Sequence, residues 1–168
     1  MHLFTGIARA FQLIFTVVVL GLSVSLARDQ VVGKVPAQTG YASFAGALGV
    51  LVSLVGIVAL FVDSLSGIIT WALDAFASVA LLVGGIIYAV ALKGVNCSKP
   101  DEHAWDNVLI SGGCKKYKGD KYCYTYGMHG SSGVKSHCIS AEADTAFMFL
   151  GFLACLAALV VGFLSRRS

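Results

Sequence analysis

Four of the five cysteines lie in the one long polar stretch of the chain, where cysteines either form disulfides or bind a metal. A structural zinc site usually takes paired ligands separated by about two to four residues, and no two cysteines in this stretch are that close. Disulfides persist in oxidising compartments outside the cytoplasm. The spacing therefore favours disulfides in an exported loop, and we predict no metal site. The four residues are Cys97, Cys114, Cys123 and Cys138.

A single acid, Asp74, interrupts the long apolar segments of the chain. A carboxyl at that depth in a membrane costs about a few kcal/mol, so it should face the protein interior or a wet cavity. Asp74 could relay protons, or it could hydrogen-bond a neighbouring helix. A relay usually recruits further intramembrane acids or histidines, and the apolar segments hold none. We therefore expect a structural role, with a channel or proton-coupled carrier as the lesser alternative. The fifth cysteine, Cys155, is interpreted as a small buried hydrophobe.

The other polar residues form no catalytic pattern. Glycine-rich phosphate loops, H-E-x-x-H and G-x-S-x-G are absent, and the four histidines lie outside the apolar segments, where they could not hold a haem between helices. A metal site could be drawn from His129, His137, Cys123 and Cys138, but disulfides explain the same thiols more simply. We expect a protein that is not an enzyme and that binds neither a cofactor nor nucleic acid.

Composition places these residues in a membrane protein. The chain of 168 residues is 57% hydrophobic and 12% charged, against about 25% charged in soluble proteins. Its apolar segments meet or approach the roughly 20 residues that a spanning helix needs. We predict an all-α bundle of four transmembrane helices in a single domain, 1–168, with one long loop at 93–144. The expected spans are 11–27, 41–62, 68–92 and 145–164.

The first apolar segment also has features of a signal peptide. Arg9 precedes a short apolar core, and the small residues Ser25 and Ala27 suit a cleavage site. We expect a retained span, with the cleaved signal as the alternative.

The two indicators of orientation disagree. Nine Lys and Arg residues fall in the first and third loops and three at the termini, so the positive-inside rule would place the long loop in the cytoplasm. Five of those lysines lie mid-loop, however, far from the membrane ends where the rule acts most strongly. The four loop cysteines favour the opposite side. We expect cytoplasmic termini and an extracellular loop.

The loop tip is predicted to form a β-hairpin, because tyrosines flank the glycine at 119. If the turn is 118–119, Cys114 faces Cys123. If it is 119–120, the two cysteines are diagonal neighbours about 7 to 8 Å apart, beyond disulfide reach. Four cysteines allow three pairings. A Cys114–Cys123 bond would select the first register and leave Cys97 for Cys138.

Small residues recur three or four apart in three of the expected spans. In membranes such faces let helix backbones approach closely, either within one bundle or between protomers. We expect internal packing to dominate, with some contact between protomers. The residues are Ala42, Gly46, Gly49, Ser53 and Gly56; Ala80 and Gly84; and Ala154, Ala158 and Gly162.

Several short motifs resemble one family. The stretches Asp63-Ser64-Leu65 and Leu73-Asp74-Ala75-Phe76 precede an aliphatic, glycine-rich run to Lys93 and Cys97, and Ser132 to Cys138 leads into the last span. This pattern is similar to the fungal MARVEL-domain proteins of the non-classical export protein type. The resemblance implies a four-helix bundle with cytoplasmic termini and carries the loop cysteine pair onto Cys97 and Cys138. The Cys114–Cys123 insert and the short C-terminal tail depart from the family pattern.

The resemblance implies a location in plasma-membrane microdomains such as eisosomes. Family members there are associated with the organisation of sphingolipid and sterol-rich domains and with unconventional secretion. We therefore expect a non-enzymatic organiser that oligomerises or binds lipid. An accessory subunit of a larger membrane enzyme or pump is the alternative from another functional class.

Overall fold

The computed structural model describes residues 2–61, 67–99, 102–118, 120–124 and 131–167. Among them are four helices long and apolar enough to cross a membrane. They are α1 (His2–Arg28), α2 (Ala37–Val58), α3 (Ile68–Ala91) and α5 (Ser131–Arg167). The predicted bundle of four spanning helices with a small two-stranded sheet is confirmed.

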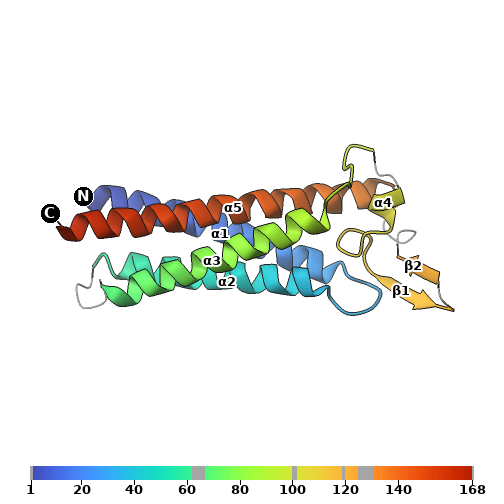
Figure 1. Ribbon diagram of the computed structural model, residues 1–168, viewed down its shortest axis with the longest axis horizontal. Coiled ribbons are helices and arrows are strands. Elements are labelled where there is room, and N and C mark those ends of the chain that lie inside the picture. The colour runs from blue at the N-terminus through green and yellow to red at the C-terminus, as the bar shows by residue number, and fades with distance from the viewer. Residues whose placement is uncertain (1, 62–66, 100–101, 119, 125–130, 168) are drawn as a thin grey trace.

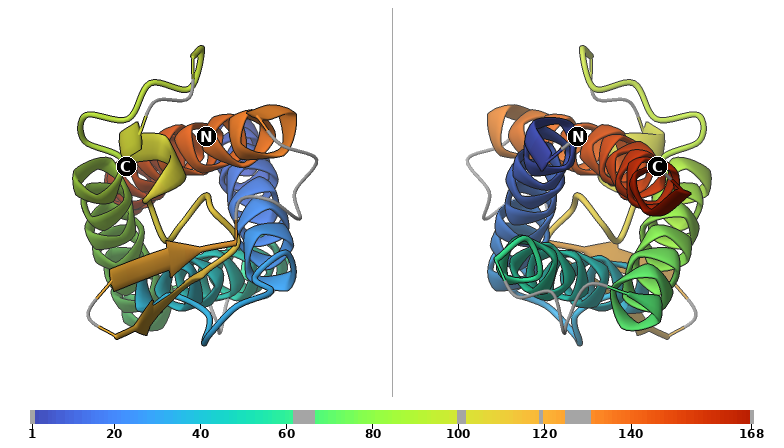
Figure 2. Two further views of the ribbon diagram at one scale, coloured as in Figure 1. Left: turned by 90° about the vertical axis from the view of Figure 1, so that its right-hand side faces the viewer. Right: turned by 90° about the vertical axis from the view of Figure 1, so that its left-hand side faces the viewer.

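The four long helices form a closed ring. Each packs against two neighbours, in the order α1, α2, α3, α5 and back to α1, so that α1 lies diagonally across from α3 (Figure 2). Both chain ends lie at one end of the bundle (Figure 1). The first loop, the short helix α4 (Glu102–Trp105) and the sheet lie at the other, which we call the loop end.

Two helices begin well before the expected spans. Helix α1 starts at His2 rather than at Phe11, which brings Arg9 into the bundle. Helix α5 starts at Ser131, although the sequence analysis extended the loop to residue 144. The physical reason for the early start of α5 is a buried apolar stripe that continues beyond the expected span.

That stripe consists of Val134, Cys138 and Ala141, which are buried at helical spacing in line with Met148 lower down. Polar residues lie on the outer face of this part of α5, and for that reason the sequence pattern predicted a loop here. Helix α2 ends at Val58, earlier than expected, and turns through Phe61. Val62, the expected end of that span, lies outside the described residues.

The small-residue faces point into the bundle. A Cβ atom built on Gly46 would lie 2.8 Å from the Leu20 backbone nitrogen, so α1 and α2 meet there almost backbone to backbone. Every predicted packing residue is buried except Gly162, which is half-buried. The buried ones are Ala42, Gly46, Gly49, Ser53, Gly56, Ala80, Gly84, Ala154 and Ala158.

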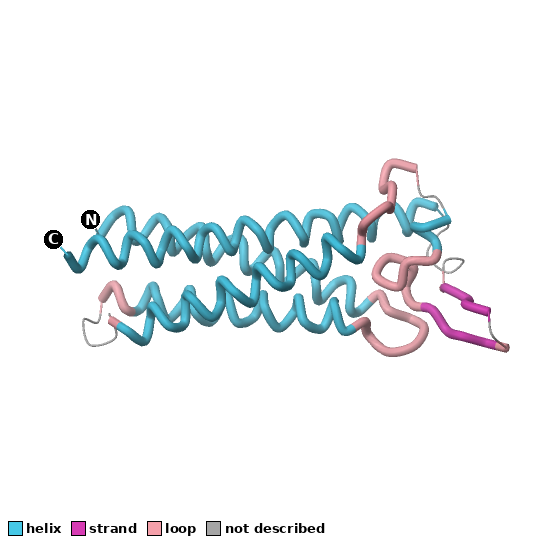
Figure 3. The backbone as a smooth tube through the Cα atoms, viewed as in Figure 1, coloured by secondary structure: helices cyan, strands magenta, loops and turns pink. Residues whose placement is uncertain are grey.

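The long loop folds into a cap over the loop end of the bundle (Figure 3). Asn107 Nδ2 donates to the Ala91 carbonyl oxygen at 2.7 Å and so satisfies a free carbonyl at the end of α3. The Gly112 carbonyl accepts from the backbone nitrogens of Val31 and Val32 in the first loop. The cap is therefore tied to both α3 and the first loop, and its Ile110 is fully buried.

The hairpin adopts the first of the two predicted registers. Strand β1 (Cys114–Tyr117) pairs antiparallel with β2 (Asp120–Cys123), with Cys114 opposite Cys123 and Tyr117 opposite Asp120. Lys118 has φ 51°, a left-handed conformation suited to a tight two-residue turn. The Cys114–Cys123 disulfide is confirmed.

Candidate functional site

A charged cluster lies inside the bundle toward the chain ends. Arg9 of α1 donates through Nη1 to Asp74 Oδ1 at 2.5 Å and through Nη2 to Oδ2 at 2.6 Å. Gln12 accepts from Arg9 at 2.8 Å and donates to Asp74 Oδ1 at 3.1 Å and to the Cys155 sulfur at 3.3 Å. We call these four residues the Arg9 cluster. All of them are buried.

Helix α2 leaves space for the Arg9 side chain. Arg9 and Asp74 belong to helices that face each other diagonally, so the guanidinium crosses the bundle interior. A Cβ atom on Gly56 of α2 would lie 2.5 Å from the Arg9 Cζ atom. Gly56 thus provides the space that the guanidinium occupies, and any larger residue there would push against the ion pair.

The geometry favours a structural role for Asp74. Both of its carboxylate oxygens accept hydrogen bonds from a guanidinium, which does not give up its proton in proteins. A proton relay needs a group that can release and regain a proton, and Arg9 is not one. We expect the pair instead to specify which helices face each other.

A second polar cluster lies at the loop end. Asp144 of α5 accepts from the Ser23 hydroxyl of α1 through Oδ2 at 2.7 Å. The Tyr88 hydroxyl of α3 lies near the Asp144 carboxylate and near the Thr39 side chain of α2. All four residues are at most 1% exposed, and we call them the Asp144 cluster. Each of the four spanning helices contributes one member.

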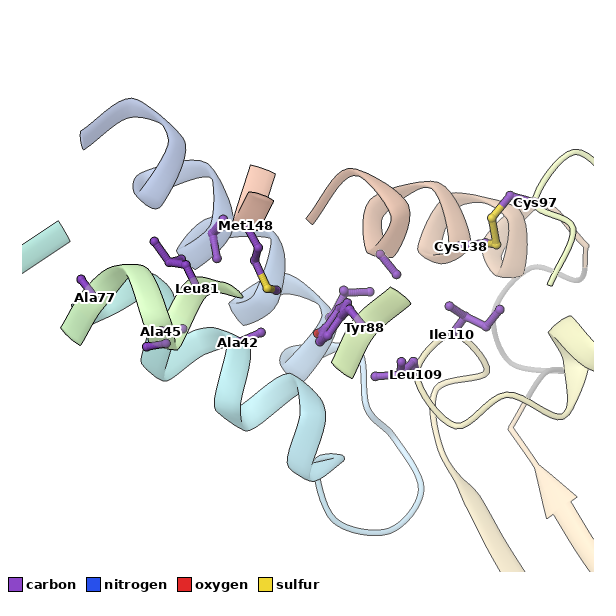
Figure 4. Close-up of a cluster of buried hydrophobic side chains, with 14 of the residues drawn as sticks. Ala42, Ala45, Ala77, Leu81, Tyr88, Cys97, Leu109, Ile110, Cys138 and Met148 are labelled. Carbon is purple, nitrogen blue, oxygen red and sulfur yellow. A yellow bond between two sulfur atoms is a disulfide. The ribbon is translucent and has the colours of Figure 1, made fainter. Parts of the chain in front are cut away.

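The Asp144 cluster is incompletely bonded. Asp144 Oδ1 and the Tyr88 hydroxyl have no hydrogen-bond partner within the described part of the chain. Figure 4 shows Tyr88 inside the bundle, between Met148 and Leu109 along its length. Sequence analysis assigned Asp144 to the loop and gave Tyr88 no role, so it missed this cluster.

A disulfide closes the cap at its base. The structure joins Cys97, just beyond α3, to Cys138 on α5, with a Cα–Cα distance of 5.4 Å (Figure 4). Glu142 lies near the two sulfurs, but bonded cysteines have no thiolate to offer a metal.

A second contact joins α5 to the first loop. His137 Nε2 lies 3.3 Å from Asp29 Oδ2, which directly follows the end of α1.

Comparison with known proteins identifies the family of this chain. A family model described as the MARVEL membrane-associating domain matches residues 2–161. The chain belongs to the MARVEL family. No curated protein and no solved structure matches it.

The outer surface of this MARVEL domain suits contact with lipid. Large apolar side chains, including Phe11, Leu51, Phe76 and Leu153, are 51% to 62% exposed around the four long helices. The one charged residue within the expected spans, Asp74, is fully buried. The four long helices thus present large apolar side chains outward, as expected of a membrane-associating protein.

Proposed function

We propose that this MARVEL protein is a non-enzymatic organiser of sphingolipid and sterol-rich microdomains of the plasma membrane, of the fungal eisosome type, with a link to unconventional secretion. The observation that carries the proposal is the division of residues between interior and surface. Many polar and small residues are buried inside the bundle, while bulky apolar side chains are exposed on its outer surface. The chain thus offers lipids a broad apolar surface, while the Arg9 cluster occupies part of the bundle interior.

We propose cytoplasmic termini and an extracellular cap. Two disulfides within the cap support this orientation, because disulfides are rare in the cytoplasm. The burial of Arg9 against Asp74 removes one positive charge from the terminal side and widens the disagreement with the positive-inside count, so the proposed orientation rests on the disulfides. Labelling of intact cells with a membrane-impermeant thiol reagent, with and without an impermeant reductant, tests this. Labelling of the four loop cysteines only after reduction supports an outside cap, and no labelling in intact cells places it inside.

Partition in vesicles tests the proposed function. Full-length protein would be reconstituted into giant vesicles in which an ordered sphingolipid and sterol phase coexists with a disordered phosphatidylcholine phase. We expect enrichment in the ordered phase or at its boundary, and more numerous domains as protein density rises. Exclusion from the ordered phase with unchanged domains would contradict the proposal. A single-span peptide of similar apolar length serves as the control for nonspecific effects.

Self-association must use a face other than the inward small-residue stripes. On α1, Gly21 is exposed and has open space around it, with exposed Ser25 one turn later. Small residues four apart on a lipid-facing surface allow close approach of a second helix. If the organiser forms homo-oligomers, this is a place on α1 where two copies can meet.

The pair of substitutions Gly21→Leu and Gly46→Leu tests that face. We expect Gly21→Leu to leave the melting temperature nearly unchanged and to reduce the self-multiples seen by blue-native electrophoresis. Gly46→Leu should instead unfold the bundle, because its side chain meets the Leu20 backbone. An unchanged ladder for Gly21→Leu would remove this face. A single large band containing a foreign protein in place of the ladder would favour the accessory-subunit alternative.

A further inference from the structure

The Asp144 carboxylate is the one buried acid of the described bundle that lacks a positive partner. Asp74 is neutralised by Arg9, whereas Asp144 accepts its hydrogen bond from the neutral Ser23 hydroxyl. An ionised carboxylate buried without a counter-charge is costly enough that it marks a functional site by default.

Among the residues that the structure describes, no charged side chain of the surrounding elements fills that gap. Helices α2 and α3 contain no Lys, Arg or His within 37–58 and 68–91. On α1 the next cation along is Arg28, which is exposed. On α5 the imidazole of His137, two turns before Asp144, is taken up by Asp29. The cap residues over the bundle mouth, Leu109 to Ser111, are uncharged.

The oxygen atoms around Asp144 match the ligands that hard cations prefer. The cluster offers one carboxylate and the hydroxyl groups of Ser23, Thr39 and Tyr88, with no nitrogen or sulfur among them. Oxygen-only ligand sets suit alkali and alkaline-earth ions rather than transition metals. A single negative charge balances a single positive one, which favours a monovalent ion over a divalent one.

The two unsatisfied atoms supply the independent indication of a ligand. Asp144 Oδ1 and the Tyr88 hydroxyl are both fully buried, within electrostatic range of each other, and unpartnered in the described part of the chain. Buried polar groups in native proteins nearly always have a partner, which can be an ion or an ordered water. We propose that the Asp144 cluster binds a partly dehydrated monovalent cation that ties all four spanning helices together beneath the cap.

The position of the cluster gives the cation a short way in. Thr39 is the third residue of α2, and Tyr88 is three residues before the end of α3. The site therefore lies at the loop end, at about 16 to 21 Å from the Arg9 cluster by the rise of 1.5 Å per helical residue. A cation arriving from the loop side does not need to cross the apolar centre of the bundle.

Thermal unfolding of the purified full chain in detergent tests the proposal. The melting temperature would be measured in NaCl, KCl and N-methylglucamine chloride at equal ionic strength, from zero to a few hundred millimolar of each small cation. We expect Na⁺ or K⁺ to raise the melting temperature saturably by about 3 to 10 °C over the organic cation. Asp144→Asn should abolish the increase, whereas Glu142→Gln, an exposed acid two residues away, should leave it unchanged.

A second variant keeps the proposal testable if Asp144→Asn fails to fold. Tyr88→Phe retains the ring and the carboxylate but removes one oxygen ligand, so the midpoint concentration of the stabilising cation should rise about tenfold. Equal melting temperatures in all three salts would overturn the proposal. So would a stability that responds to pH but to no cation, because the carboxyl would then be held as the neutral acid beside a water molecule.

Discussion

Removing either partner of the Arg9–Asp74 pair is expected to destabilise the bundle by about 3 to 5 kcal/mol, because the remaining charge is left buried and unpaired. Asp74→Ala should have the full effect. Asp74→Asn should cost less, since an amide oxygen still accepts from Arg9 and Gln12. The measurement is the free energy of unfolding from SDS titration of the protein in mixed micelles, followed by tryptophan fluorescence.

The double variant Arg9→Met, Asp74→Leu separates the charge from the packing. Replacing a buried ion pair by apolar residues of similar volume is often neutral or stabilising, so the double variant should recover most of the loss in Asp74→Ala. Arg28→Met removes an exposed arginine from the end of the same helix and should change stability by less than about 0.5 kcal/mol. A double variant as unstable as the worse single variant would show that the two side chains do not act as a pair.

The Arg9 cluster explains why helices α1 and α3 need no direct packing face. They lie across the diagonal of the ring, where their backbones are kept apart by α2 and α5. A bidentate guanidinium is long enough to bridge that gap and has a preferred geometry for a carboxylate. The pair thus specifies one arrangement of four helices that nonspecific apolar contacts in lipid would leave open.

Sequence patterning predicted the number of spans and a hairpin with two possible registers, because both rest on local signals. Runs of apolar residues near the bilayer length identify the spans whatever their neighbours are. The tyrosines and the glycine at 119 predicted the hairpin, and only the Cys114–Cys123 bond of the structure selects the first register. Small residues at a spacing of three or four identified the buried faces of α2 and α3 for the same reason.

The interior of α1 could not be found in that way, because this helix buries polar residues instead of small ones. Its inward face carries Arg9, Gln12, Thr16 and Ser23 at helical spacing, whereas Phe11, Ile14 and Val17 face outward. Starting the span at Phe11 excluded the arginine and broke the pattern. A search for polar residues at intervals of three, four and seven in 2–28 would have detected it.

The Asp144 cluster was hidden for a related reason. Asp144 was placed in the loop because acids normally mark the end of a span, and the helical stripe above it includes Cys138, which was assigned to a loop disulfide. Only tertiary packing reveals that Ser23 and Tyr88 lie near the Asp144 carboxylate and that Thr39 lies near Tyr88, although the four residues are far apart in the sequence. No single-sequence spacing links positions on four different helices.

The Cys97–Cys138 disulfide is expected to contribute more stability than Cys114–Cys123. Their sequence separations are 41 and 9 residues. In the loop-entropy model these lengths correspond to about 4 and about 2.6 kcal/mol. The first value is an upper bound here, because the membrane already restrains α3 and α5. The double variants Cys97→Ser with Cys138→Ser, and Cys114→Ser with Cys123→Ser, would be compared by thermal unfolding.

The two double variants should also become sensitive to protease in different parts of the chain. Cys97 and Cys138 belong to the same buried core cluster as Ile110 and Tyr88, so loss of their bond should loosen the whole cap and speed protease cleavage across it. Loss of Cys114–Cys123 should increase cleavage only within the exposed hairpin. Equal cleavage patterns in the two variants would contradict this division. Because the base disulfide closes the cap above the Asp144 cluster, its loss should also weaken cation-dependent stabilisation, which loss of the hairpin disulfide should leave intact.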